Sequence, residues 1–185
     1  NFFFFFLVFK RLDVDIDYSA KIRGINCIKI GKNFHAGKNL WLDAVVLYEK
    51  QKFSPRLIIG DNVSVQDFVH IGATNYVEIG NNVLFASKVY VTDHNHGIYD
   101  GDIQSSPEEP PYLRKLTNDK EVVIGYNVWV GEGVTILPGV HIGKCSIIGS
   151  NAVVSKNIPE FSIAVGAPAR VIKRYDKELN NWINV

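Results

Sequence analysis

A six-residue repeat is the feature that most restricts the fold of this chain. From Ile124 onward the sequence divides without a break into the blocks IGYNVW, VGEGVT, ILPGVH, IGKCSI, IGSNAV and VSKNIP, each opened by an aliphatic residue. Earlier segments such as IGKNFH, IGDNVS and IGNNVL keep the same frame, with shifts between groups. A fixed period of this kind is assigned before any helix or strand, because it sets the architecture of the whole chain.

The period favours strands over helices. Six is a multiple of 2, the side-chain repeat of a strand, and not of 3.6, so short strands keep one face inward where an amphipathic helix would drift. Glycine follows many of the opening aliphatic residues and Gly-x-Asn recurs, which supplies residues that tolerate positive φ at a corner. Three blocks would make a coil of about 18 residues, and stacked coils bury a continuous aliphatic column. The sequence therefore predicts an all-β solenoid.

The repeat also sets the expected boundaries. We place the solenoid at residues 28–173, after an apolar segment and entry region at 1–27. The repeat stops over 92–123, where prolines, acids and Asp-Gly-Asp indicate an inserted loop. A long insertion in a rigid scaffold is typical of a binding or catalytic loop. At 174–185 the repeat ends, and apolar residues recurring at three to four positions predict a short capping helix.

Charge and composition exclude some classes of partner. Lys and Arg total 20 against 19 Asp and Glu, so no overall field attracts nucleic acid. The two cysteines, Cys27 and Cys145, form no CxxC pair and fit packed thiols in a reducing compartment. Phe2 to Phe9 is far shorter than the roughly 20 residues of a membrane helix. We expect it to pack on a core or an interface in a cytoplasmic protein. The alternative is a peripheral contact with the inner face of the membrane, aided by Lys10 and Arg11.

These blocks resemble the hexapeptide-repeat acyltransferases, whose coils form a left-handed parallel β-helix. The left hand comes from the resemblance, since the general crossover rule predicts the opposite. The resemblance covers roughly residues 28–173 and is closest to the sugar O-acetyltransferases of bacterial polysaccharide and O-antigen synthesis, with galactoside and maltose acetyltransferases more distant. It implies a homotrimer with active sites between neighbouring solenoids, and acetyl-CoA as co-substrate.

The stretch VTDH at the start of the inserted loop resembles the catalytic segment of that family, and the matching histidine is the general base. This resemblance gives the role to His94. A sugar hydroxyl is a weak nucleophile, and a neutral imidazole that takes its proton eases attack on the thioester. A zinc site like that of the γ-class carbonic anhydrases is the alternative, but His94 and His96 would need at least one further ligand. We expect no metal.

The resemblance also assigns acceptor and donor residues. Around His94, the residues expected to contact the acceptor or fix the histidine tautomer are Asp93, Asn95 and His96 in the loop, with Gln66 and Asp67 in the preceding coil. Gln66 departs from the Asn common in galactoside and maltose enzymes. The expected CoA-binding residues are Trp129, Gly131, Glu132, Ser150, Ser155, Lys156, Arg170 and Lys173. Cations among them suit the phosphates of CoA.

The function expected on these grounds is transfer of acetyl from acetyl-CoA to a hydroxyl of a saccharide acceptor, in a surface polysaccharide such as O-antigen or capsule or in its precursor. Three alternatives stay open: an acetyltransferase acting on a free sugar, serine or xenobiotic; a zinc-dependent hydratase; and a non-catalytic solenoid scaffold. Residue types alone name neither the sugar nor the hydroxyl.

Overall fold

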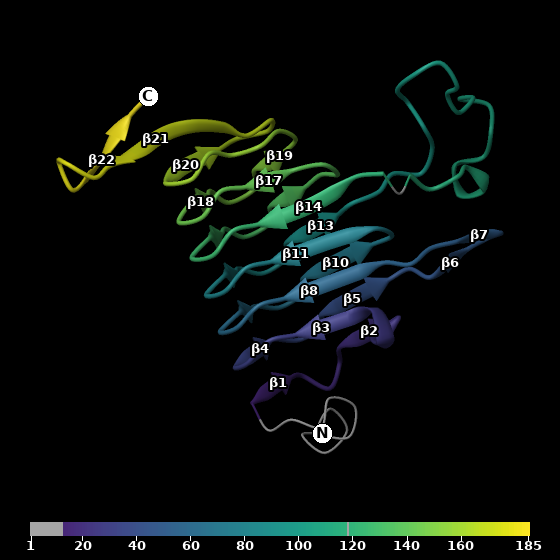
Figure 1. The fold of residues 1–185 in the computed structure, drawn as a ribbon, viewed down its shortest axis with the longest axis horizontal. Helices are drawn as coiled ribbons and strands as arrows, with labels where there is room; N and C mark the ends of the chain where they lie inside the picture. The colour runs from purple at the N-terminus through teal and green to yellow at the C-terminus, as the bar shows by residue number, and fades with distance from the viewer. Residues whose placement is uncertain (1–12, 118) are drawn as a thin grey trace.

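The structure is a computed structural model that describes residues 13–117 and 119–185. Over these residues the chain winds as a solenoid, and successive strands pass in turn to three different sheets (Figure 1). Each strand of a coil pairs in parallel with its equivalent in the neighbouring coil; Val14 of β1, for example, lies opposite Phe34 of β4. The predicted β-solenoid is therefore confirmed.

Three sheets form the faces of the solenoid, and within the described residues the strands of each sheet lie side by side in the following order. The nine-stranded sheet contains β1 (Val14–Ile16), β4 (Phe34–Ala36), β9 (Ser64–Val65), β12 (Leu84–Phe85), β15 (Trp129–Val130), β18 (Ile147–Ile148), β20 (Ser162–Val165), β21 (Arg170–Asp176) and β22 (Asn181–Asn184). The six-stranded sheet contains β19 (Val153–Val154), β16 (Thr135–Ile136), β13 (Tyr90–Thr92), β10 (His70–Ala73), β5 (Trp41–Ala44) and β2 (Lys21–Arg23). The five-stranded sheet contains β17 (His141–Ile142), β14 (Glu121–Ile124), β11 (Tyr76–Ile79), β8 (Arg56–Ile59) and β3 (Ile28–Ile30).

The core is the aliphatic column that the repeat predicts. On the six-stranded sheet, Leu42, Ile71, Val91 and Ile136 lie at equivalent positions in successive coils and are fully buried. Burying one such side chain contributes about 1.5 to 3 kcal/mol. The stacked rows therefore supply the driving force for each coil to pack on the next, and they fix which strand residues point outward.

A ladder of asparagines runs along the corner between the five- and nine-stranded sheets. Asn33, Asn62, Asn82 and Asn127 have φ between 53° and 57°, and each side-chain amide donates to the next at 2.9 to 3.0 Å. Cys145 holds the next position with φ 57°. The recurring Gly-x-Asn therefore has a physical cause, because Asn tolerates the left-handed conformation and bonds its neighbour in the stack.

Two insertions leave the solenoid at one corner, the column of turns leading from the six-stranded to the five-stranded sheet, which we call the insertion corner (Figure 1). The first carries a hairpin of β6 (Leu47–Tyr48) and β7 (Gln51–Lys52), which the sequence did not reveal. The second is the predicted loop; β13 ends at Thr92 and β14 begins at Glu121. It contains the 3₁₀ turn η2 (Pro111–Leu113), while η1 (Ile25–Cys27) lies between β2 and β3.

Side-chain contacts join the two insertions. Gln51 of β7 accepts from the Leu116 backbone N–H at 2.8 Å and donates to the Leu116 carbonyl at 3.2 Å. Tyr48 of β6 donates to the carbonyl of Tyr112 at 2.6 Å. Within the loop, the Arg114 guanidinium bonds two carbonyl oxygens and the Tyr99 hydroxyl. The hairpin and the loop therefore form one wall above the coils.

The capping helix expected at 174–185 is wrong. β21 runs antiparallel to β20 and to β22, and Tyr175 packs against Trp182 across the hairpin with ring centroids 5.3 Å apart. The spacing of the apolar residues fits either structure in so short a segment. The edge of β20 decides the outcome, because its backbone donors and acceptors are satisfied by an added strand and not by a helix.

The start of the solenoid also differs from the expected boundary. The first coil begins at β1 and β2, which pair with β4 and β5, so residues before 28 already belong to the β-helix. The Phe-rich stretch at 2–9 lies outside the described residues. No helix in residues 13–117 and 119–185 is long and apolar enough to cross a membrane.

Candidate functional site

His94 stands at the insertion corner, directly after β13. Its Nδ1 lies 2.8 Å from a carboxylate oxygen of Asp93, and the Thr92 hydroxyl lies 3.3 Å from the same nitrogen. An ionised carboxylate can only accept, so the proton of the neutral imidazole is held on Nδ1 and the lone pair on Nε2. The side chain is 13% exposed and lines a cavity. His94 is therefore oriented to accept a proton.

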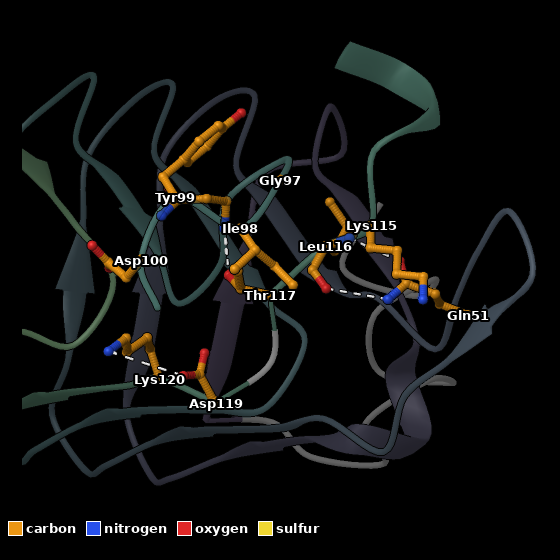
Figure 2. A pocket seen from close by; sticks show the side chains of 11 residues that line it. Gln51, Gly97, Ile98, Tyr99, Asp100, Lys115, Leu116, Thr117, Asp119 and Lys120 are labelled. Carbon is orange, nitrogen blue, oxygen red and sulfur yellow. Dashed lines mark hydrogen bonds and ion pairs between the residues drawn. The ribbon is translucent and has the colours of Figure 1, made fainter. Parts of the chain in front are cut away.

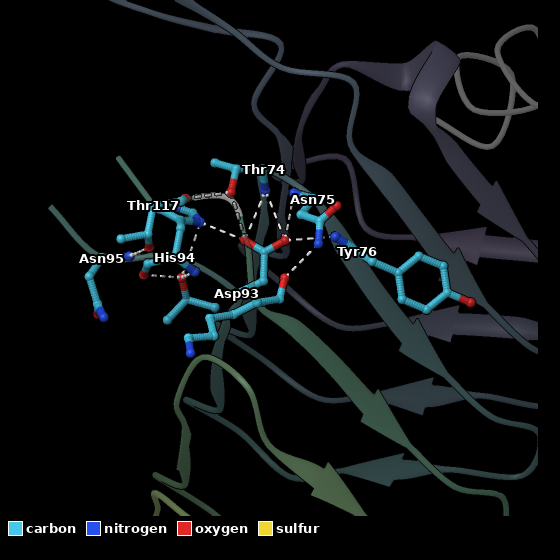
Figure 3. A network of polar contacts seen from close by, with 9 residues as sticks. Thr74, Asn75, Tyr76, Asp93, His94, Asn95 and Thr117 are labelled. Carbon is cyan, nitrogen blue, oxygen red and sulfur yellow. Dashed lines mark hydrogen bonds and ion pairs between the residues drawn. The ribbon is translucent and has the colours of Figure 1, made fainter. Parts of the chain in front are cut away.

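Asp93 is held in a ring of donors, shown in Figure 3. Its two oxygens accept from the backbone N–H groups of Thr74, Asn75 and Tyr76 at 2.8 to 3.0 Å and from the Thr74 hydroxyl at 3.1 Å. Those donors come from the preceding coil, where β10 turns into β11. The side chain is 0% exposed. Of the two roles expected for Asp93, the geometry fits fixing of the His94 tautomer and corrects the expected contact with the acceptor, because Asp93 is buried behind the imidazole.

The cavity beside His94 has a volume of about 370 Å³. Its floor is the outer side of the six-stranded sheet, and the hairpin residues Leu47 and Tyr48 with the loop residue Leu116 form its wall. His96 also lines it; the Tyr48 hydroxyl lies 3.2 Å from His96 Nδ1, and burial raises the pKa of Tyr48. His94 and His96 therefore line the same cavity.

An aromatic column that the sequence reasoning missed crosses the cavity floor. Trp41, His70 and Tyr90 occupy the same register on β5, β10 and β13. The Trp41 and His70 rings stack at 4.0 Å with a 4° interplanar angle, and the His70 and Tyr90 centroids are 5.1 Å apart. The ammonium of Lys21 covers the other side of Trp41 at 4.3 Å. The facing sides of Trp41 and His70 are therefore covered by each other, while Tyr90 is tilted by 39° against His70.

Burial lowers the pKa of His70 from its usual value of 6.5, with the Asp43 carboxylate acting in the opposite direction. Repulsion between protonated His70 and the cationic forms of His94, Arg23 and Lys21 lowers the pKa of His70 further. His70 is therefore a neutral imidazole at neutral pH, able both to donate and to accept a hydrogen bond.

This shift predicts how stability depends on pH. Below about pH 6.5 the unfolded state binds a proton at His70 more readily than the folded state, so stability is lost as the pH falls through that window. His70→Gln removes the titration. We expect the difference in thermal midpoint between wild type and His70→Gln to move in favour of the variant as the pH is lowered below about 6.5. Differential scanning fluorimetry across this range is the measurement, and parallel curves for the two proteins would contradict the prediction.

An ion pair closes one end of the cavity. Arg23 Nη2 lies 2.7 Å from Asp43 Oδ2, and the Asp43 side chain is only 13% exposed. Both residues occupy one outward row of the six-stranded sheet, in register with Gly72. The two outward rows become visible when the strand segments KIR, WLDA and HIGA are aligned in the register of the structure. The sequence alone does not give this register, because it does not show which blocks are neighbours or where the insertions cover them.

Asn95 lies away from His94. Its backbone N–H donates to the Thr117 hydroxyl at 2.9 Å, and the residue is exposed. It lines a second cavity of about 380 Å³, between the loop and the hairpin residue Gln51 (Figure 2). Figure 2 shows Tyr99 and Lys120 on the walls of this second cavity. Asn95 therefore faces a different space from the imidazole of His94.

Gln66 and Asp67 are not brought to His94 within one chain. They lie in the turn before β10, whereas His94 follows β13, so they occupy the opposite corner of the six-stranded sheet. Asp67 accepts the backbone N–H of Lys38 at 2.7 Å, which makes it part of the stacked corner. Gln66 is exposed there. The structure therefore does not place Gln66 or Asp67 near an acceptor bound at His94 of the same chain.

The expected donor residues fall into three groups. Trp129 is 51% exposed on the outer side of the nine-stranded sheet, and Gly131, Glu132 and Ser150 follow in the adjacent turns. A Cβ on Gly131 would lie 2.7 Å from the Ser150 nitrogen, so these turns stack closely. Ser155 and Lys156 are exposed at the insertion corner, beyond β19.

The third group is on the C-terminal hairpin. Arg170 is exposed at the start of β21 and Lys173 is half-buried within it. Arg170 Nη1 donates to the carbonyl of Ala169 at 2.9 Å. In one chain, therefore, Trp129 with its neighbours and His94 lie at opposite ends of the strands of the six-stranded sheet.

The part of the chain that the structure describes contains no group of three or more His, Cys, Asp or Glu side chains placed to hold a metal ion. His35 and His141 each pair instead with a carboxylate, Asp15 at 2.9 Å and Glu121 at 3.1 Å.

Comparisons with known proteins identify relatives of this chain. Residues 121–156 match the family model described as bacterial transferase hexapeptide (six repeats). The chain is 44% identical over 177 residues to "Putative lipopolysaccharide biosynthesis O-acetyl transferase WbbJ" of Escherichia coli (strain K12), covering 95% of this chain and 86% of that protein. It is 32% identical over 142 residues to galactoside O-acetyltransferase of the same organism, covering 74% of this chain and 62% of that protein.

A solved structure shares the fold. A mutant of AntD, an N-acyltransferase from Bacillus cereus in complex with dTDP-4-amino-4,6-dideoxyglucose and Coenzyme A, superimposes with a TM-score of 0.69 at 20% identity, covering 90% of this chain and 83% of that one. The solenoid is a left-handed parallel β-helix, as the resemblance implied. The hexapeptide family model and the 44% identity over 95% of the chain together show that the chain belongs to the hexapeptide-repeat acyltransferases.

Proposed function

We propose that the protein transfers an acetyl group from acetyl-CoA to a hydroxyl of a sugar in a surface polysaccharide or its precursor, with His94 as the general base. The observation that carries the proposal is the Asp93–His94 pair, in which a 2.8 Å contact holds Nδ1 and leaves Nε2 without a hydrogen-bond partner among the described residues. The 44% identity to a protein named for lipopolysaccharide biosynthesis supports the class of acceptor.

The reaction follows from this geometry. Nε2 of His94 takes the proton of the acceptor hydroxyl while the oxygen attacks the thioester carbon of acetyl-CoA. The tetrahedral intermediate then collapses, the carbon–sulfur bond breaks, and the CoA sulfur leaves with the proton returned from Nε2. Asp93 stabilises the imidazolium that exists between these steps, because its carboxylate remains bonded to Nδ1. A base positioned in this way contributes about 10²- to 10⁴-fold to the rate.

The donor is proposed to bind across a subunit boundary. Trp129 and the adjacent turns lie at the opposite end of the six-stranded sheet from His94 of the same chain. A homotrimer would place Trp129 and the adjacent turns of one solenoid beside His94 of another. Light scattering combined with size-exclusion chromatography measures this directly, and a stable monomer that retains full activity would reject the inter-subunit arrangement.

The test of the function is a transfer assay with isotopically labelled acetyl-CoA across methyl glycosides and defined oligosaccharides. The position of the acetyl ester is then determined by NMR. Free serine is the matched acceptor that has a hydroxyl but no sugar ring. Labelled ester on a glycoside supports the proposal, whereas transfer only to serine, or to none of these acceptors, rejects it. Repeating the assay with a metal chelator distinguishes this reaction from a zinc-dependent one.

A prediction for the donor site accompanies the proposal. We expect Arg170→Ala and Lys156→Ala each to raise the KM for acetyl-CoA by about 10- to 100-fold with little change in kcat, because a lost charged hydrogen bond to phosphate costs about 1.5 to 3 kcal/mol. These phosphates are remote from the reacting carbon. Steady-state kinetics with varied acetyl-CoA give both constants.

The matched control for these variants is Lys29→Ala, which removes an exposed cation from β3 on the five-stranded sheet. Its donor KM is expected to equal that of wild type. An unchanged donor KM in both Arg170→Ala and Lys156→Ala would reject their assignment to the donor site.

A further inference from the structure

Gly72 interrupts a row of outward side chains on the cavity floor. The row runs through Arg23, Asp43, Gly72 and Thr92, which lie opposite one another on β2, β5, β10 and β13. Gly72 is within a strand and its φ lies outside the left-handed region. Glycine weakens a strand interior and often marks a site that a ligand approaches closely.

The surroundings of Gly72 differ from those of the corner glycines. A Cβ on Gly60, Gly125 or Gly143 would lie 2.2 to 2.6 Å from a neighbouring turn, so the stacking of coils requires those glycines. A Cβ on Gly72 would meet only His94 Cε1 at 3.4 Å, His70 Nε2 at 3.9 Å and the Val91 carbonyl oxygen at 4.0 Å. These are ordinary contacts, so the fold tolerates alanine at this position. The missing side chain instead leaves space beside the imidazole of His94, which we call the Gly72 notch.

Polar groups that can form hydrogen bonds with hydroxyls border the notch. Asp43 Oδ2 is held by Arg23 at 2.7 Å, and no hydrogen bond within the described residues engages Asp43 Oδ1. His70, His94 and Asp43 line the same cavity as Gly72. A carboxylate oxygen accepts from a hydroxyl, and a neutral imidazole bonds a hydroxyl in either direction. The notch therefore offers one proton acceptor for a reacting hydroxyl and separate partners for a second hydroxyl.

We propose that the Gly72 notch receives the edge of a sugar ring that carries two neighbouring hydroxyls. One hydroxyl lies against His94 and is acetylated, while its neighbour bonds Asp43 and His70. This inference rests on the proposed function and narrows its substrate class to a vicinal diol of a hexose residue. An isolated hydroxyl, as in serine, would leave the partly buried Asp43 carboxylate without its ligand contact, and a site built to bind a hydroxyl strongly disfavours analogues that lack it.

The first test adds one methyl group to the notch. Gly72→Ala is expected to lower kcat/KM for the best methyl hexopyranoside of the transfer assay by about tenfold or more, because a displaced ring edge loses alignment with the base. The KM for acetyl-CoA should equal that of wild type, and the thermal midpoint should not fall. The matched control is Val123→Ile, which adds one methyl group to the outer side of β14 on the five-stranded sheet and should leave all constants unchanged. Wild-type acceptor kinetics in Gly72→Ala would overturn the proposal.

The second test pairs Asp43→Asn with monodeoxy glycosides. With the parent sugar, the variant should lose about tenfold or more in kcat/KM. With the analogue that lacks the hydroxyl next to the acetylated one, wild type should already show this loss and Asp43→Asn should add little to it. A merely structural role of Asp43 would reduce turnover of both sugars equally, and that result would overturn the assignment.

Binding separates failure of this inference from failure of the proposed function. Saturation-transfer NMR with the same methyl hexopyranosides, in the presence of CoA, reports occupancy without turnover. If wild type transfers acetyl and Gly72→Ala does so equally well, the notch assignment fails and the proposed function stands. If wild type transfers no acetyl to any glycoside, the proposed function fails. Glycoside binding to wild type that is lost in Gly72→Ala then still supports the notch. Equal binding to both proteins, or no binding to wild type, overturns the notch assignment.

Discussion

His94→Ala lowers kcat by about 10²- to 10⁴-fold while leaving the fold and acetyl-CoA binding nearly intact, because the substitution removes the proton acceptor alone. Asp93 keeps its four donors from Thr74, Asn75 and Tyr76 when the imidazole is lost, so the corner remains satisfied. Single-turnover kinetics at saturating acetyl-CoA measure the chemical step, and circular dichroism checks the fold.

His96→Ala is the internal control for His94→Ala. It removes a neighbouring imidazole at the cavity wall whose Nδ1 contacts Tyr48 and not Asp93. A much smaller decrease is expected. A His94→Ala enzyme that still transfers acetyl at close to the wild-type rate would overturn the general-base role, as would complete loss of wild-type activity on chelation with recovery on adding zinc.

Asp93→Asn combines a large loss of stability with a large loss of rate. One carboxylate oxygen accepts from Asn75 and Tyr76 and the other from His94 and the Thr74 hydroxyl, while the Thr74 N–H is shared between them. An amide nitrogen at either oxygen position would face N–H or O–H donors and could not accept their hydrogen bonds. Each buried donor left without its acceptor costs about 1 to 3 kcal/mol, so we expect the free energy of unfolding to fall by several kcal/mol. Chemical denaturation measures the change in the free energy of unfolding.

The rate effect of Asp93→Asn comes through the imidazole. An amide nitrogen facing Nδ1 favours the tautomer with the proton on Nε2, which cannot act as a base toward the acceptor. We expect kcat to fall by at least about 10²-fold, measured at a temperature where the variant is folded. Thr74→Val is the control, since it removes only the hydroxyl donor and keeps the carboxylate and the three backbone donors. A variant with wild-type stability and kcat would contradict the role of Asp93.

The repeat predicted the coils because its period acts locally: every aliphatic position faces inward whatever the neighbouring coil contains. The outward rows are different, because they depend on which coils become neighbours. Along the asparagine ladder the separations are 29, 20, 45 and 18 residues, since insertions of different lengths intervene. Trp41, His70 and Asp43 therefore meet only after the coils stack, and no fixed spacing in the sequence reveals them.

Two other differences have local causes. The hairpin of β6 and β7 is too short, at two residues per strand, for alternation to distinguish it from a loop. The C-terminal apolar spacing fits a helix, but the open backbone edge of β20 favours β21. The resemblance to known enzymes points to His94 as the candidate base. The burial of Asp93 could not be predicted from the sequence, because the groups that donate to it belong to a different coil.

The insertion corner separates the stacked coils, which hold the molecule together, from the two insertions, which form the wall of the cavity beside His94. Both the hairpin and the long loop leave the solenoid after strands of the six-stranded sheet, and the register of the coils resumes beyond each of them. A change in the length or sequence of either insertion reshapes the cavity wall without altering a single pairing in the stack. The shape of the cavity and the position of the Asp93–His94 pair are therefore structurally separable, because the insertions form the cavity wall while the backbone donors that hold Asp93 come from a turn of the coils themselves.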